Sequence, residues 1–147
     1  MDKNRVKTAN EGSKVNKSDL SAQAVLKATP SHVEELNDLI VDSIQDIKGK
    51  NIVKLDLRKL DDGPTDFFII CEGDSTTQVK AIAGNIHKRL KEELGQPPYH
   101  VEGVATARWI CMDCFNTVVH VFHREAREFY DIENLWSDAK FTEYENL

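Results

Sequence analysis

The sequence predicts an α/β protein in which helices pack on a mixed sheet of about five strands. Apolar residues recur at helical spacing in three long segments, and short runs rich in Val, Ile and Phe lie between these segments. The 147 residues are enough for one such domain and too few for two. The expected order of elements is α-β-β-α-β-β-β-α, folded as a sandwich.

The first helix is predicted to begin at Ser31 and to end near Gly49. Ser31 and Glu34 form an S-x-x-E capping box directly after Pro30, and a glycine commonly ends a helix in the left-handed conformation. Apolar residues follow the box at helical spacing, which indicates one buried face. These residues are Val33, Leu36, Leu39, Ile40, Ile44 and Ile47.

Two strands and a second helix are expected next. Residues 52–57 alternate between apolar and charged side chains, as in a half-buried strand. Residues 66–72 are apolar on both faces, which is typical of a central strand. An Asp-Asp-Gly-Pro turn joins the two. Ser75 and Gln78 then form a second capping box, and the helix that follows is expected to end at Gly95.

Three more strands complete the predicted sheet. A turn over residues 114–117 joins the last two of them, which places Cys111 opposite His120 in an antiparallel hairpin. These strands are expected over residues 99–102, 108–113 and 118–123.

A final helix is predicted over residues 124–136, and four of its residues at helical spacing are expected to face the sheet. These are Ala126, Phe129, Ile132 and Trp136. The chain therefore divides into a disordered basic leader over residues 1–30, a folded domain over residues 31–138 and an acidic C-terminal tail over residues 139–147.

Charge is unevenly distributed along the chain. The formal net charge is −6, but residues 1–30 carry +3, so the remainder carries −9. Nucleic acids are bound mainly through Lys and Arg on phosphates, so no direct nucleic-acid specificity is expected of this domain. An acidic domain suits a basic protein partner better.

Cysteine use and hydropathy indicate a cytoplasmic protein. Three cysteines are an odd number, which does not fit a disulfide framework and fits reduced thiols. No apolar stretch with a cleavage site follows the N-terminus, so secretion is not expected. The longest apolar run, residues 67–71, is far shorter than the roughly 20 residues of a membrane-spanning helix.

Four potential zinc ligands lie close together in the sequence, in the order Cys111, Cys114, His120 and His123. The predicted hairpin separates Cys114 from His123 by about 20 Å and turns the two histidines to opposite faces. No metal site is therefore expected. A catalytic pair of Cys111 and His120 fits the hairpin geometry, but no oxyanion hole or third orienting group is recognisable beside it.

Two further features have competing interpretations. The loop over residues 73–77 precedes a helix, where phosphates often bind, but it lacks the G-x-x-x-x-G-K pattern and is predicted to be a plain helix cap. The first helix carries several acidic residues that repel one another at i, i+4 spacing. They form either an acidic docking stripe or a solvated face, and they are Glu34, Glu35, Asp38, Asp42 and Asp46.

Several ordered blocks of sequence resemble one protein family, that of the ribosomal silencing factors (iojap-like proteins), over residues 32–138. The blocks are T-D-F-F-I-I-C-E-G-D-S from Thr65, V-E-G from Val101, A-R-W-I from Ala107 and V-V-H-V-F from Val118. A last block contains Glu125, Arg127, Phe129-Tyr130, Glu133 and Leu135-Trp136. The turn before the V-V-H-V-F block departs from the family pattern, because Phe115 and Asn116 stand where glycine and aspartate are usual.

The resemblance implies a topology similar to nucleotidyltransferases without their catalytic residues, and the chain indeed has no D-x-D pair. It implies a repressor of translation, not an enzyme, that binds a basic ribosomal protein on the intersubunit face of the large subunit and blocks the small subunit. It also implies homodimers when the protein is free, and no cofactor. The alternative is a nucleotide-handling enzyme on the same scaffold. The expected contact residues are Thr65, Asp66, Trp109, Glu125, Arg127, Tyr130, Glu133 and Trp136.

Overall fold

Seven strands form one mixed sheet in the computed structural model, which describes residues 6–9 and 30–147. The order across the sheet is β1-β7-β2-β3-β6-β5-β4. Only β3 and β6 are parallel neighbours, and every other neighbouring pair is antiparallel. The bounds are Val6–Ala9 (β1), Lys50–Asp56 (β2), Phe67–Gly73 (β3), His100–Glu102 (β4), Trp109–Cys114 (β5), Thr117–His123 (β6) and Lys140–Tyr144 (β7).

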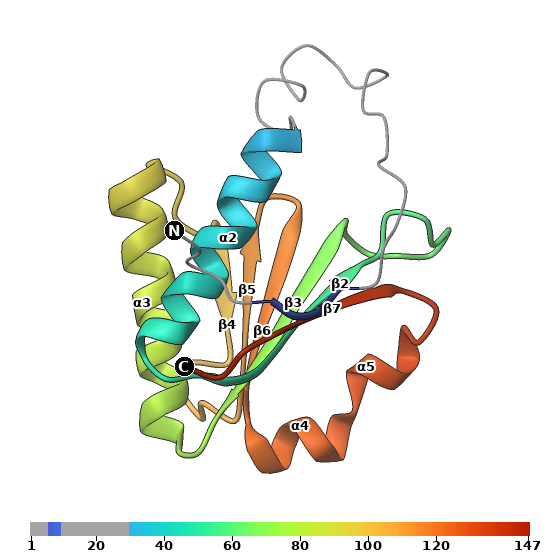
Figure 1. Cartoon of the computed structure of the whole chain (residues 1–147). Coiled ribbons are helices and arrows are strands. Elements are labelled where there is room, and N and C mark those ends of the chain that lie inside the picture. Colours follow the sequence, from blue (N-terminus) through green and yellow to red (C-terminus); the bar gives the residue numbers. More distant parts are fainter. Residues whose placement is uncertain (1–5, 10–29) are drawn as a thin grey trace.

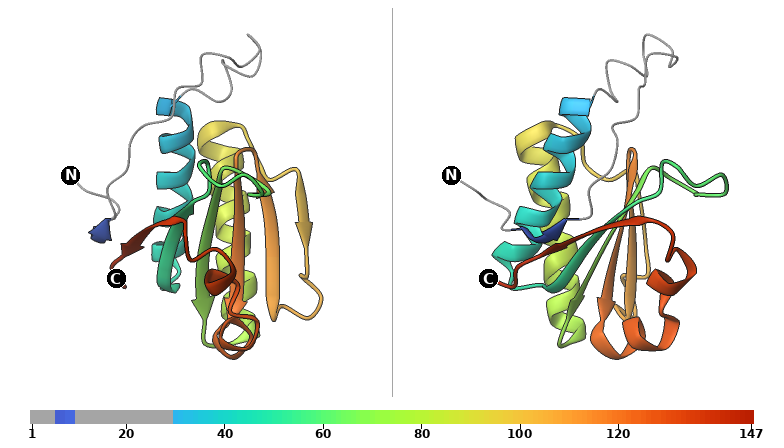
Figure 2. Two further views of the ribbon diagram at one scale, coloured as in Figure 1. Left: turned by 90° about the vertical axis from the view of Figure 1, so that its right-hand side faces the viewer. Right: turned by 45° about the vertical axis from the view of Figure 1, so that its right-hand side comes forward.

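Helices cover the two faces of this sheet unequally (Figure 1). The long helices α2 (Pro30–Asp46) and α3 (Thr76–Leu94) pack side by side on one face. The short helices α4 (Arg124–Tyr130) and α5 (Ile132–Leu135) lie on the other face, near the end of β6 (Figure 2). No helix in the described part of the chain is both long and apolar enough to cross a bilayer.

A side-chain cap explains where α3 begins, and a left-handed glycine explains where it ends. Ser75 is the N-cap, and its Oγ accepts a hydrogen bond from the backbone N–H of Gln78 at 3.1 Å. The Gln78 Oε1 accepts a hydrogen bond from the backbone N–H of Asp74 at 2.8 Å. The predicted capping box is therefore present, but its second hydrogen bond comes from the residue before the N-cap and not from the N-cap itself. Gly95 ends the helix at φ +64°, which glycine adopts without strain. Helix α2 already begins at Pro30, so Ser31 lies in its first turn and not at the predicted cap position.

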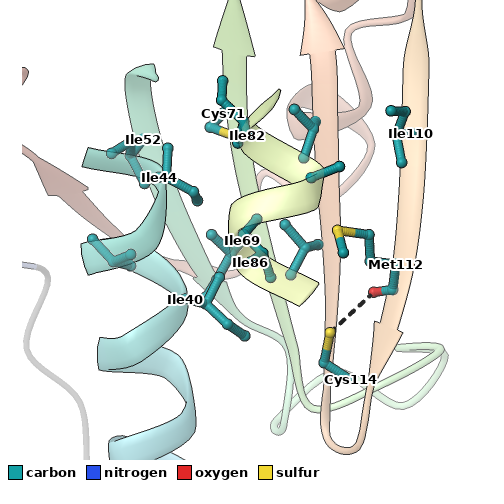
Figure 3. Close-up of a cluster of buried hydrophobic side chains, with 14 of the residues drawn as sticks. Ile40, Ile44, Ile52, Ile69, Cys71, Ile82, Ile86, Ile110, Met112 and Cys114 are labelled. Carbon is teal, nitrogen blue, oxygen red and sulfur yellow. Dashed lines mark hydrogen bonds between the residues drawn. The ribbon is translucent and has the colours of Figure 1, made fainter. Parts of the chain in front are cut away.

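The larger core lies between the sheet and the two long helices (Figure 3). Ile40 and Ile44 of α2 and Ile82 and Ile86 of α3 pack here against Ile69 of the central strand, and all five are fully buried. A smaller cluster lies on the opposite face, where α4 and α5 contribute Ala126 and Ile132. Strand β3 therefore has apolar side chains on both faces, as its sequence predicts.

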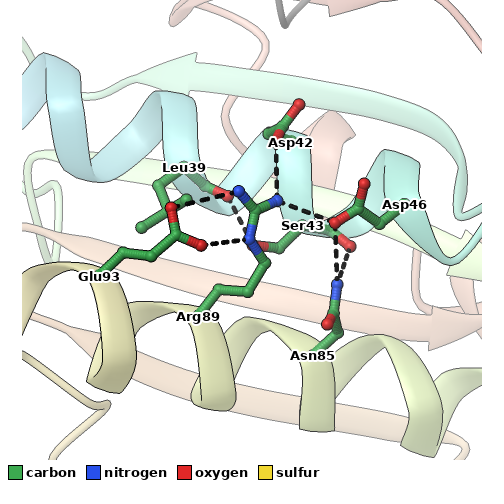
Figure 4. Close-up of polar contacts among 7 residues, drawn as sticks. All are labelled: Leu39, Asp42, Ser43, Asp46, Asn85, Arg89 and Glu93. Atoms are coloured by element: carbon green, nitrogen blue, oxygen red, sulfur yellow. Dashed lines mark hydrogen bonds and ion pairs between the residues drawn. The ribbon is translucent and has the colours of Figure 1, made fainter.

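An ion-pair cluster joins the two long helices (Figure 4). Arg89 of α3 contacts Asp42 at 2.7 Å and Asp46 at 2.8 Å, both on α2, and Glu93 of its own helix at 2.6 Å. Two of the five acidic residues of the predicted stripe thus hold the helices together, a role that neither interpretation of the stripe anticipated. Glu34, the first residue of the stripe, is exposed.

The sheet has two more strands than the five predicted, β1 and β7. Strand β7 lies in the segment that was expected to be a C-terminal tail, and it pairs with β2 from Val53↔Glu143 to Asp56↔Lys140. Strand β1 lies within the expected leader and pairs with the outer edge of β7. The rest of that predicted leader, residues 1–5 and 10–29, lies outside the described residues.

The predicted final helix is divided into two. Asp131 has a φ of +45°, which ends α4 and changes the direction of the chain before α5. Ala126 and Ile132 face the sheet as expected, and Trp136 is half-buried. The prediction for Phe129 is wrong, because the break leaves its side chain 80% exposed.

Tyr144 provides a test of whether β7 belongs to the folded domain. Its side chain is 5% exposed and packs in the larger core, so Tyr144→Ala should lower the free energy of unfolding by about 3 kcal/mol in urea denaturation. Leu147→Ala is the matched control, because that side chain is 39% exposed and should cost less than about 0.5 kcal/mol. Equal and small effects of both changes would mean that the end of the chain does not pack as described.

Candidate partner-binding surface

An aromatic cluster occupies the sheet face that the long helices leave open. Its centre is Trp109, the first residue of β5, which lies opposite Phe122 in the hairpin of β5 and β6. The indole stacks on the Phe122 ring, with centroids 4.9 Å apart, and contacts the Tyr130 ring of α4 at the same centroid distance. We call this surface the aromatic face and define it by Phe68, Trp109, His120, Tyr130 and Trp136.

His120 lies behind Trp109 in the aromatic face. Its Nδ1 accepts a hydrogen bond from the indole Nε1–H at 3.0 Å, and its ring meets that of Phe68 edge-on, with centroids 4.5 Å apart. The residue is 6% exposed, and this burial lowers the pKa of the imidazole to about 4. The imidazole is therefore neutral at physiological pH, with its proton on Nε2 because Nδ1 is the acceptor.

Trp136 extends the aromatic face beyond the end of α5. Its ring meets Phe68 edge-on, with centroids 6.2 Å apart, and it is half-buried against the smaller core cluster. Tyr130 is 50% exposed. The structure therefore brings the three predicted aromatic residues to one side of the sheet, where large side chains remain partly accessible. Such residues are frequent anchors in protein interfaces.

Arg127 of α4 is the centre of an ion-pair network beside the aromatic face. Its guanidinium binds Glu133 through two hydrogen bonds of 2.9 Å, Glu72 at 3.0 Å and the backbone carbonyl of Asn51 at 2.6 Å. The arginine side chain is only 10% exposed, so these internal partners occupy it. Arg127 and Glu133 thus fix α4 and α5 against the sheet, and both belong to the predicted contact residues.

An acidic groove of about 540 Å³ borders this network at the end of β3. Five carboxylates and two guanidinium groups line it, and both Glu125 and Glu128 on α4 are exposed. We call it the acidic groove and define it by Glu72, Arg124, Glu125, Arg127, Glu128, Asp131 and Glu133. The excess of carboxylates makes this surface attractive to cationic side chains of a partner.

Thr65 and Asp66 lie apart from the other predicted contact residues. The Thr65 hydroxyl donates to the backbone carbonyl of Asn116 at 2.9 Å, and the Asn116 side chain donates to Asp66 at 2.9 Å. Both residues precede β3, whereas Glu72 is near its end, so the length of β3 separates them from the acidic groove by about 20 Å. Asn116 lies in the turn between β5 and β6, and Phe115 in this turn has a φ of +57°. Phe115 is one of the two residues at which the sequence departs from the family pattern.

The Cys/His cluster has the hairpin register predicted for it, with Cys111 opposite His120. Burial raises the pKa of the Cys111 thiol to about 11, so the thiol is protonated and is a weak nucleophile. His120 already accepts the Trp109 N–H through Nδ1. Within residues 6–9 and 30–147, no three His, Cys, Asp or Glu side chains are grouped so that they could hold a metal ion.

Phe68 and His120 were not among the contact residues predicted from the sequence, and neither were three acidic residues of the groove. Strand alternation could have placed Phe68 and His120 beside Trp109, because the parallel pairing of β3 and β6 and the hairpin of β5 and β6 set all three on one face. The acidic groove had no comparable signal, since it depends on the break at Asp131.

Comparison with known proteins gives a consistent family match. The family model described as "Ribosomal silencing factor during starvation" matches residues 30–147. The chain is 39% identical over 114 residues to the ribosomal silencing factor RsfS of Halalkalibacterium halodurans, covering 78% of this chain and 96% of that protein. It is 34% identical over 79 residues to mouse "Mitochondrial assembly of ribosomal large subunit protein 1", covering 52% of this chain and 35% of that protein.

Solved structures show the same fold. A crystal structure of a Chromobacterium violaceum protein superposes with a TM-score of 0.67 at 38% identity, covering 71% of this chain and 86% of that one. A crystal structure of a Bacillus halodurans protein gives a TM-score of 0.62 at 39% identity, covering 70% of this chain and 94% of that one.

The buried imidazole of His120 predicts a specific pH dependence of stability. Its pKa is about 4 in the folded protein and about 6.5 when exposed, so only the unfolded chain binds a proton between these values. The contribution of His120 to stability is therefore complete above pH 6.5. As the pH falls to 4, the free energy of unfolding decreases by up to about 3 kcal/mol because of this one group.

Urea denaturation of the wild type and of His120→Phe between pH 7 and pH 4 measures this contribution. The difference in unfolding free energy between the two proteins should change across this range in favour of the variant. His87→Phe makes the same substitution at an exposed position of α3 and is the matched control for the change of side chain. A difference between wild type and His120→Phe that is constant with pH would contradict the buried neutral imidazole.

Proposed function

The chain belongs to the ribosomal silencing factor family, and from this premise we propose that it binds the large ribosomal subunit through a basic ribosomal protein at the intersubunit face. Bound there, it occupies the space that the small subunit needs, and so it lowers translation in the cytoplasm. The single observation that carries the proposal is the aromatic face beside the acidic groove. The name of the mouse relative also refers to the large ribosomal subunit.

Charge and shape together support a basic protein as the partner. The acidic groove offers exposed carboxylates on α4, which favour encounter with Lys and Arg side chains. The aromatic face supplies Trp109 and Tyr130 as large anchors for the centre of an interface. A repressor that acts by occlusion needs such a surface on a rigid body, and the sheet with its two long helices provides one.

The predicted contact residues divide into three groups in this proposal. Trp109, Tyr130 and Trp136 contact the partner through apolar surface. Glu125 contacts a cationic side chain, while Arg127 and Glu133 keep the acidic groove in shape through their ion pair. Thr65 and Asp66 reach the partner only if the interface extends along the whole of β3.

Sedimentation of purified subunits tests the proposed function directly. Small and large subunits are mixed in a sucrose gradient with and without a saturating amount of the protein. We expect a smaller peak of full particles, and we expect the protein to sediment in the large-subunit fractions. Undiminished full particles at saturation would overturn it. The sedimentation of the free protein, measured alone, tests the expected homodimer.

Variants of the two surfaces should weaken binding to large subunits without unfolding the protein. Tyr130→Ala removes a half-exposed ring and should raise the Kd by about tenfold or more, as at interface anchors. The double change Glu125→Lys and Glu128→Lys should raise the Kd most at low salt, because it reverses two exposed charges of the acidic groove. Co-sedimentation over a range of protein concentrations measures both effects.

Glu92→Lys is the matched control for the charge reversal. It reverses the charge of one exposed glutamate of α3, on the opposite face of the sheet, where the α4 variant reverses two. Its Kd should stay within about twofold of the wild type, as for surface residues outside an interface. If this control weakens binding as much as the α4 variants do, the partner does not bind the proposed surface.

A further inference from the structure

The orientation of the Trp109 indole depends on one hydrogen bond. The stack on Phe122, with ring planes 28° apart, limits the tilt of the indole but is equally compatible with a ring turned by 180° about the Cβ–Cγ bond, which exchanges its two edges. The contact with Tyr130 is tilted at 45° and does not select one edge either. The bond from Nε1 to His120 Nδ1, 3.0 Å long, fixes which edge of the indole points inward and which edge remains outside.

Packing in turn fixes the imidazole of His120. Its backbone lies between β3 and β5, paired with Ile70 and Cys111, and its ring meets Phe68 edge-on and lies parallel to Phe122 at 17°. The side chain is almost inaccessible to water, so water does not compete for Nδ1. The acceptor is therefore held in place before any partner arrives.

The packing of the imidazole ring does not explain why a histidine occupies this buried position. The Nε2 of His120 is buried and has no hydrogen-bond partner among the described residues, although it carries the proton. Leaving a buried donor unsatisfied destabilises a folded protein, and a phenylalanine ring of similar shape would avoid that cost. The one interaction that phenylalanine could not make is the bond to Trp109.

We propose that His120 is a positioning residue for partner binding: it holds the Trp109 indole in the orientation in which Trp109 contacts the partner. The inference rests on the proposed function, since the partner is the basic protein argued for above. His120 itself does not contact this partner. It acts through Trp109, which packs between Phe122 and Tyr130 at the surface.

His120→Phe and His120→Asn distinguish positioning from packing. The phenylalanine variant keeps a ring but has no acceptor, so it should fold with a Tm at pH 7 equal to or above that of the wild type. Its Kd for large subunits should nevertheless rise by about three- to tenfold, the value of one hydrogen bond. The asparagine variant places an oxygen where Nδ1 lies and should recover much of the affinity in spite of lower stability.

The indole N–H signals give a direct spectroscopic readout. The chain has two tryptophans, so a ¹⁵N-labelled sample shows two side-chain signals, and Trp136 serves as the internal reference. The Trp109 signal should shift upfield and exchange faster with solvent in His120→Phe, and should keep its position in His120→Asn. His87→Phe makes the same substitution at an exposed site of α3 and should change neither signal nor affinity.

The two readouts separate the failure of this inference from the failure of the proposed function. If the wild type does not bind large subunits, the proposed function fails. An unshifted Trp109 signal in His120→Phe would independently show that His120 does not position the indole. If the wild type binds and His120→Phe binds equally well, the inference is overturned while the proposed function stands. Weaker binding with an unshifted indole signal would also overturn it, because His120 would then act without Trp109.

Discussion

The parallel pairing of β3 with β6 is the constraint on which the rest of the structure depends. The two strands pair over their full length, from Phe67↔Thr117 to Gly73↔His123. Their ends therefore coincide, so α4 begins directly beside Glu72, and Arg127 can bind that carboxylate. At the opposite end the same register brings Asp66 to the turn of the β5–β6 hairpin. The ion-pair network of Arg127 and the contact of Asp66 with the hairpin turn thus both depend on this one strand pair.

The same pairing requires a crossover, and the crossover makes the two faces of the sheet unequal. Helix α3 returns the chain over one face and packs there with α2, which closes that face with the larger core. Among the described residues, the other face receives only the short α4 and α5, and the aromatic face remains partly uncovered between them and β5. A surface for a partner therefore follows from the topology, and the sequence of that surface determines which partner fits.

Local patterns were sufficient for most of the fold and for part of the candidate site. Helix periodicity, the Ser75 cap and the hairpin register with Cys111 opposite His120 were predicted correctly, since each depends on neighbouring residues. Strand β7 escaped prediction because its pairing with β2 joins residues about ninety positions apart. The left-handed Asp131 gave no strong signal either, since aspartate also occurs inside helices. The exposure of Phe129 and the shape of the acidic groove follow from that break and could not be predicted without it.

Hydrogen exchange of the protein with and without large subunits tests most directly whether it binds by the face that the long helices leave open. We expect slower exchange on binding at the start of β5, where Trp109 lies, and through α4 and α5, which contain Tyr130 and precede Trp136. Exchange along the exposed side of α3 should stay unchanged. Slower exchange confined to α2 and α3, with β5 and α4 unaffected, would contradict binding by this face.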